Sequence, residues 1–160
     1  MARACGFVWA FPITFVGLLY VTLFSLLRWC NFSGRHGDAL VWSVDRRKAP
    51  KWFCHTTYCG HTFGNVVVST MDLSTRAGQV MLRHEQEHVH QQQVLGVFYP
   101  LFYWTMSLGL LFCRSAHHIY DNSLEVDARR TAGQVIDVVG VVKYALEIGK
   151  MKHVQRDGDK

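Results

Sequence analysis

The sequence lacks the even-numbered, regularly spaced cysteines that mark a small disulfide-stabilised secreted domain. Its five cysteines are odd in number and unevenly spaced, at Cys5, Cys30, Cys54, Cys59 and Cys113. This excludes a disulfide framework, although a single bridge between Cys54 and Cys59 stays open if the domain faces an oxidising compartment. No internal repeat is present, and 160 residues allow one domain of ordinary size without room for a second catalytic domain.

A concentrated basic surface is also missing from the sequence, although the chain is basic overall. The formal net charge is +5 and the pI is near 9.1. The Lys and Arg residues are scattered, with one cluster at Arg46, Arg47, Lys48 and Lys51. Domains that bind nucleic acids usually gather such residues on one face or along one helix. We therefore expect no nucleic-acid partner.

Charge is absent from Gly6 to Leu27, an apolar run about as long as the roughly 20 residues that a membrane-spanning helix needs. The run predicts a single-pass transmembrane anchor over residues 1–30. A cleaved signal peptide is the competing interpretation, but its apolar region is usually about 7 to 15 residues long, and no small-x-small cleavage pattern follows Leu27. More basic residues follow the run than precede it, so the positive-inside tendency predicts a cytoplasmic location for the main domain.

The rest of the chain predicts an α+β domain with a small antiparallel sheet. Residues 31–38 are polar and contain two glycines, and we interpret them as a linker to a domain over residues 39–149, followed by a charged tail over residues 150–160. Alternating, aromatic and β-branched residues predict three short strands, over Ala39 to Val44, Lys51 to Tyr58 and His61 to Thr70.

Two helices are expected after the strands. Asp72 or Ser74 can cap a helix whose apolar stripe of Ala77, Val80 and Met81 continues into His84 and His88, which would point both histidines at the core. The last helix is expected to start near Ser123, with apolar residues at helical spacing up to Val142.

The stretch from His84 to His88 reads H-E-Q-E-H and matches the H-E-x-x-H zinc motif. On a helix each residue advances by about 100°, so side chains four apart lie within roughly 40° of each other, one turn up. Both imidazoles can therefore reach one metal ion. The carboxylate of Glu85 lies near the same face, whereas His90 points about 160° away from His88 and should be exposed.

A hydrolytic zinc site has three protein ligands and leaves a fourth position to water, so the histidine pair needs a partner. Glu125 is the best candidate, because a carboxylate in the first turn of a second helix can approach the first helix. The alternative interpretation makes Glu125 a capping partner for Asn122, three residues earlier. Other ligand types nearby are Asp121, Asp127, His117 and His118.

The segments TFGNVVVS, HEQEHVHQQQ and NSLEVDARR together resemble zincin metallopeptidases of the gluzincin type, and most closely the small DUF4157-like peptidase domains of bacteria and phages. The similarity covers roughly His61 to Arg130. It implies a minimal zincin fold with an edge strand beside the motif helix. It also implies Glu85 as the catalytic base and, as zinc ligands, His84, His88 and Glu125.

The chain departs from this resemblance at one position. Many gluzincins place an aspartate four residues after the ligand glutamate to orient a histidine, but this sequence has Arg129 there. Asp127 is the nearest residue that could substitute.

Motif and resemblance predict a zinc-dependent metallopeptidase that acts on a protein or peptide substrate and is tethered to a membrane by its N-terminal helix. In the expected mechanism Zn²⁺ lowers the pKa of its water toward about 7, Glu85 removes the proton, and Glu85 returns it to the leaving amine. His117, His118 or Tyr120 could donate a hydrogen bond to the oxyanion. The alternative is a non-catalytic membrane-associated zinc-binding or interaction module, against which Glu85 argues, because a structural site needs no base.

The apolar stretch from Val94 to Cys113 tests this hypothesis. A straight helix of that length would cross a bilayer and separate His88 from Glu125 by about 30 Å. Gly96 and Pro100 offer a natural break, so we expect the stretch to fold back. A second metal site is conceivable at Cys54, His55, Cys59 and His61, but the spacing of these residues matches no common zinc motif. A short hairpin is the preferred interpretation of this segment.

Overall fold

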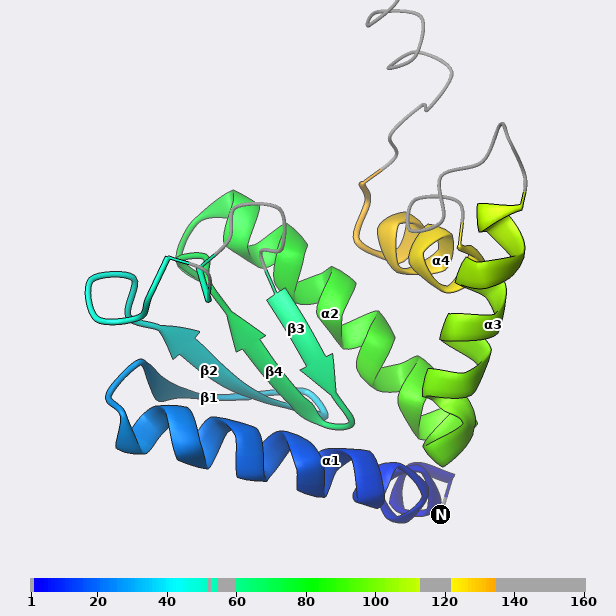
Figure 1. The fold of residues 1–160 in the computed structure, drawn as a ribbon, viewed down its shortest axis with the longest axis horizontal. Helices are drawn as coiled ribbons and strands as arrows, with labels where there is room; N and C mark the ends of the chain where they lie inside the picture. Colours follow the sequence, from blue (N-terminus) through cyan, green and yellow to red (C-terminus); the bar gives the residue numbers. More distant parts are fainter. Residues whose placement is uncertain (1, 52, 55–59, 113–121, 135–160) are drawn as a thin grey trace, which may run out of the picture.

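The computed structural model describes residues 2–51, 53–54, 60–112 and 122–134, with side chains from Gly6 onward (Figure 1). The described residues form an α+β fold, which confirms the predicted class. The elements follow one another as α1 (Ala2–Leu26), β1 (Cys30–His36), β2 (Ala39–Val44), β3 (Gly60–Phe63), β4 (Val66–Ser69), α2 (Arg76–Leu95), the short 3-10 helix η1 (Gly96–Phe98), α3 (Tyr99–Leu111) and α4 (Ser123–Thr131).

The sheet has the strand order β1-β2-β4-β3 and is mixed. The pairs β1–β2 and β3–β4 are antiparallel, whereas β2 and β4 run parallel, so the predicted all-antiparallel sheet is wrong. The reason is that the single strand expected over His61 to Thr70 is a hairpin. Gly64 takes a positive φ of 59° at its turn, and the returning strand β4 inserts beside β2. Strand β3 is thereby left at the edge.

Two further sequence predictions about strands need correction. The stretch expected to be a linker, residues 31–38, supplies most of β1, which pairs with β2 through a β-bulge near Gly34. Within the strand expected over Lys51 to Tyr58, the described residues Lys51, Phe53 and Cys54 lie in turns, while residues 52 and 55–58 lie outside the described part. The strand predicted over Ala39 to Val44 is confirmed as β2.

Strand β4 is buried on both faces because a helix covers each side of the sheet. Val67 belongs to a core cluster with Leu82 and Val89 of α2. Its neighbours Val66 and Val68 point the opposite way, into a cluster that contains Val21 of α1. The continuous Val66-Val67-Val68 run is therefore explained by a sheet between two helices, which fixes α2 firmly against one face.

Helix α1 is packed along the sheet and is not a free-standing anchor. It turns a stripe of mostly small residues inward, at Ala10, Thr14, Gly17 and Val21. The Thr14 hydroxyl donates to the Asn65 side chain and accepts from the Asn65 backbone N–H, at 3.2 and 3.0 Å. From Gly6 to Leu26 the helix is long and apolar enough to cross a membrane, and so is the combined stretch Arg76–Leu111. The orientation across a membrane stays a prediction.

The apolar stretch after the motif helix breaks where the sequence indicates. Helix α2 ends at Gly96, whose φ is 55° and where a Cβ would collide with the Trp9 ring of α1. Pro100 then lies in the first turn of α3, where a missing N–H costs no helical bond. Figure 1 shows α2 and α3 meeting in a V, with α4 between its arms. His88 and Glu125 therefore end on the same side.

Candidate metal centre

Helix α2 presents its motif on the face that packs against the sheet and α4. Thr75 caps the helix by accepting from the Gly78 N–H, so the predicted caps are displaced by one residue or more. Asp72 instead closes the turn before the helix through Ser74. The buried face runs through Gly78, Met81, Leu82, Glu85, His88, Val89, Gln91 and Gln92. Ala77, expected in the apolar stripe, is exposed, and His90 is exposed as predicted.

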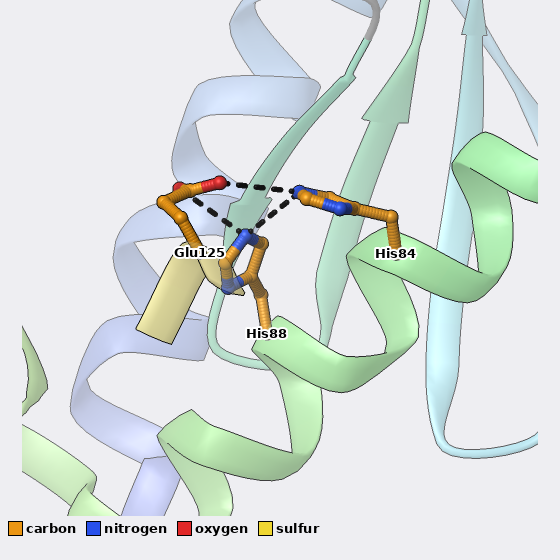
Figure 2. A group of neighbouring side chains, drawn as sticks. All are labelled: His84, His88 and Glu125. Carbon is orange, nitrogen blue, oxygen red and sulfur yellow. Dashed lines mark hydrogen bonds and ion pairs between the residues drawn. The ribbon is translucent and has the colours of Figure 1, made fainter. Parts of the chain in front are cut away.

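The ligand atoms of His84, His88 and Glu125 lie close together (Figure 2). The two Nε2 atoms lie 3.1 Å apart. One carboxylate oxygen of Glu125 lies 3.4 Å from Nε2 of His84, and the other lies 3.4 Å from Nε2 of His88. The Glu125 carboxylate, chosen from the sequence as the third ligand, therefore contacts both histidines. All three side chains are mostly shielded from water.

The spacing of these atoms is close to that of ligands around a tetrahedral metal ion. Zinc binds histidine nitrogen and carboxylate oxygen at about 2.0 to 2.1 Å, so two ligands of a tetrahedral ion lie about 3.3 Å apart. The contacts of 3.1, 3.4 and 3.4 Å are each near that spacing, and the two contacts of Glu125 are made by its two different oxygens. Two imidazoles and one carboxylate are also a ligand set found in hydrolytic zinc sites. The three residues can hold the ion and leave a fourth position for water.

Gln91 fixes which nitrogen of His88 faces the site. Its amide N–H donates to the backbone carbonyl of Leu124 at 2.9 Å, so its oxygen must face the other way. That oxygen lies 2.9 Å from Nδ1 of His88 and accepts the Nδ1 proton. The Nε2 lone pair of His88 is thereby left for a metal. Among the described residues, Nδ1 of His84 has no hydrogen-bond partner, so its tautomer is not set in this way.

Helix α4 is held so that Glu125 points at α2. The side chain of Asn122, fully buried, accepts from the Leu124 N–H as the helix cap and donates to Ser107 and to the Tyr103 carbonyl of α3. The Tyr103 hydroxyl donates to Glu125 at 3.0 Å. Asn122 thus caps the helix without help from the Glu125 carboxylate, which contacts the histidines.

Neither Asp127 nor Arg129 takes the role of the expected aspartate. Asp127 is exposed and pairs with Arg130 at 3.6 Å, so it does not orient a histidine. Arg129 lies 4.0 Å from Glu125. The partner that orients His88 is Gln91, on the motif helix itself.

Glu125 and His88 stabilise each other's charged forms. Burial alone raises the pKa of Glu125, but hydrogen bonds and charge from the two imidazoles outweigh it and hold that pKa well below its usual range. Burial lowers the pKa of His88, yet hydrogen bonding to Glu125 and the charges of Glu85 and Glu125 outweigh it, and the net shift is upward. The site therefore concentrates negative charge around the imidazoles, which favours a cation.

Glu85 is buried beside the edge strand. The Thr62 hydroxyl of β3 donates to its carboxylate at 2.6 Å. A Cβ at Gly60 would lie only 2.6 Å from Oε1 of Glu85, so the glycine makes room for the carboxylate. The Glu85 charge also acts on His61 of β3, whose pKa burial nevertheless lowers. Strand β3 and α2 together therefore hold Glu85 next to the histidine pair.

Sequence reasoning missed several of these contacts. Tyr99 hydrogen-bonds to His88, and Tyr103 hydrogen-bonds to Glu125. Both tyrosines lie in the apolar stretch, and their spacing of four residues is the sequence signal that could have identified them. The role of Gly60 depends on a contact 25 positions away in the chain, and no local signal marks it. Cys54 has a free thiol. The remaining expected candidates lie outside the described residues: His55, Cys59, His117, His118, Tyr120 and Asp121.

In comparisons with known proteins, no family model, no curated protein and no solved structure matches this chain.

Proposed function

We propose that this chain is a membrane-associated zinc metallopeptidase, a minimal zincin in which His84, His88 and Glu125 hold the metal. The observation that supports this best is the grouping of the ligand atoms, whose contacts of 3.1, 3.4 and 3.4 Å are each close to the spacing of two ligands around a tetrahedral zinc ion. A bound zinc ion supplies Lewis acidity, which polarises a carbonyl group and makes water more acidic.

Glu85 is the base of this proposal. Its carboxylate follows the first histidine of the pair in sequence and is buried, and in this role it would take a proton from the metal-bound water and return it to a leaving amine. Its hydrogen bond from Thr62 keeps it turned toward β3. Gln91 and Tyr103 are positioning residues in this proposal, because they act through His88 and Glu125.

Strand β3 is the proposed binding edge for a peptide substrate. Within the described part of the chain β3 pairs with no strand but β4, and its Thr62 carbonyl also accepts a hydrogen bond from the Gln92 side chain. An extended peptide can add to such an edge through main-chain hydrogen bonds. It would then run past Thr62 and Glu85, beside the proposed metal ligands. In this proposal β3 serves as the edge strand that the resemblance to zincins implies.

The test combines metal analysis with hydrolysis of a mixed library of fluorogenic peptides by the detergent-purified full chain. We expect one zinc per chain in the wild type and in Glu85→Gln, and hydrolysis in the wild type alone. His88→Ala should lose most of the zinc. His90→Ala is the matched control, because His90 lies on the same helix but is exposed, and this variant should keep both zinc and hydrolysis.

Two results would contradict the proposal. A folded wild-type chain that never retains zinc would exclude the metal site. Stoichiometric zinc without any hydrolysis that depends on Glu85 would favour the non-catalytic zinc-binding module instead.

A further inference from the structure

Helix α1 has the reverse of the pattern of a helix on a water-soluble protein. As far as Gly17 its inward stripe is small or polar, with Ala10, Thr14 and Gly17, and only further along does the apolar Val21 join the core. Its outward face carries large apolar side chains, at Val8, Trp9, Phe11, Phe15, Val16, Leu19, Leu23 and Leu26. In water the apolar face of a helix turns inward, whereas helices in lipid use small residues for contact with protein.

Helix α3 repeats this arrangement. Tyr99, Tyr103 and Ser107 form a stripe at a spacing of four that faces the metal centre and the cap of α4. Most of the remaining surface is exposed and apolar, at Leu101, Phe102, Trp104, Met106, Leu108 and Leu111. The exposed Thr105 hydroxyl donates to carbonyls of its own helix, which satisfies it without water.

The two outward faces are joined and account for nearly all exposed large apolar side chains of the described residues. Apart from Phe32, every one of these side chains lies between Val8 and Leu27 or between Val94 and Phe112. The two stretches meet where the Trp9 and Phe98 rings pack at a centroid distance of 6.1 Å. This surface, which we call the α1–α3 surface, contains no charged residue from Gly6 to Leu27 or from Val94 to Phe112.

We propose that the α1–α3 surface is embedded in the acyl chains of a bilayer, so that the metal centre lies one helix away from lipid. Helix α3 has 13 residues and is about 20 Å long, too short to cross a hydrocarbon core of about 30 Å but long enough to enter one leaflet. The same helix contacts lipid on one side and, through Tyr99 and Tyr103, the metal centre on the other.

This placement points to a substrate class. Only α3 separates the metal centre from the acyl chains, so a peptide bond inside or close to a membrane segment of another protein is the bond best placed to reach it. This part rests on the proposed metallopeptidase function. The lipid contact does not rest on it, and the two can be tested separately.

The lipid contact is tested on the full chain in vesicles of phosphatidylcholine with brominated or ordinary acyl chains, by measuring quenching of tryptophan fluorescence. Trp104 of α3 is 66% exposed, so Trp104→Phe should fold and should remove a measurable share of the bromine quenching. Trp9→Phe should remove a further share. Trp42→Phe is the control, because Trp42 lies on β2 and packs against Phe32, and its quenching share should be close to zero.

Any other quenching result overturns the proposed lipid contact. If Trp9 contributes to quenching and Trp104 does not, the chain is anchored by α1 alone. If neither contributes and cross-linking through α3 joins two chains, a second copy covers the surface instead of lipid.

The substrate class is tested by comparing protein N-termini in membranes from cells that express the wild-type chain or Glu85→Gln. We expect new N-termini that depend on Glu85 within membrane spans or directly beside them. New N-termini only in soluble proteins would overturn the substrate class while leaving the metallopeptidase. If none depends on Glu85, the proposed function and the substrate class both fail, and the quenching result stands by itself.

Discussion

Replacing Gln91 by Met should weaken metal binding as well as folding. The substitution keeps the volume of the side chain but removes both of its hydrogen bonds, to Nδ1 of His88 and to the Leu124 carbonyl. The Leu124 carbonyl loses the hydrogen bond that Gln91 donates to it, whereas His88 can still use the Tyr99 hydroxyl at 3.2 Å. His88 is then free to take the other tautomer, which puts a proton on the nitrogen that faces the metal.

The magnitude follows from these contacts. A buried group left without its hydrogen-bond partner costs about 1 to 3 kcal/mol, so we expect that loss in the free energy of unfolding without metal. Loss of a partner that orients a metal-binding histidine typically weakens metal affinity by about 10- to 100-fold. A loss in that range corresponds to about 1.4 to 2.8 kcal/mol of binding free energy.

Gln92 supplies the matched control. It is the next residue, is also buried, and also makes two hydrogen bonds, from the Gly64 N–H and to the Thr62 carbonyl. Gln92→Met should therefore destabilise the fold to a similar extent but leave the intrinsic zinc affinity within about threefold of wild type. The assay is zinc competition with a fluorescent chelator at a temperature where circular dichroism shows each variant folded. Equal zinc affinities for the Gln91 and Gln92 variants would refute the reasoning.

Two more predictions test the surroundings of the site, and a third tests the core between α1 and the sheet. Gly60→Ala places a methyl group against the Glu85 carboxylate and should reduce hydrolysis at least tenfold while zinc content, measured by mass spectrometry, stays at the wild-type level. Asn122→Ala removes the cap of α4 and should lower the free energy of unfolding in denaturant by about 1 to 2 kcal/mol for the cap alone, more when its two bonds to α3 are included; an unchanged midpoint would contradict the cap. Burial raises the pKa of the Cys30 thiol, so the neutral thiol contributes stability that is present below its ordinary pKa of 9.0 and is lost as pH rises through the higher folded value. The stability gap between wild type and Cys30→Ala should therefore narrow above pH 9.0, and a gap that widens there would refute this sign.

Local patterns in the sequence were sufficient for the elements that depend on neighbouring residues. The strand at Ala39 to Val44, the motif helix, the break near Gly96 and Pro100, and the start of the last helix at Ser123 all follow from periodicity, caps or breakers within a few positions. The errors came from pairing. A polar, glycine-bearing stretch forms β1, and a single apolar run is the hairpin β3–β4, because strand pairing supplies hydrogen bonds that no local pattern reports.

The sequence by itself determined that His84, Glu85 and His88 share one region of a helix, because their spacing and the helix period are local properties. Whether Glu125 meets them depended on the turn at Gly96, on the Asn122 contacts with α3 and on the Gln91 bond to Leu124. Only the tertiary structure decided this, because these contacts join residues far apart in the chain. It also decided which way the apolar helices face: a run without charge shows that a helix avoids water, but only packing shows which side is left to meet lipid.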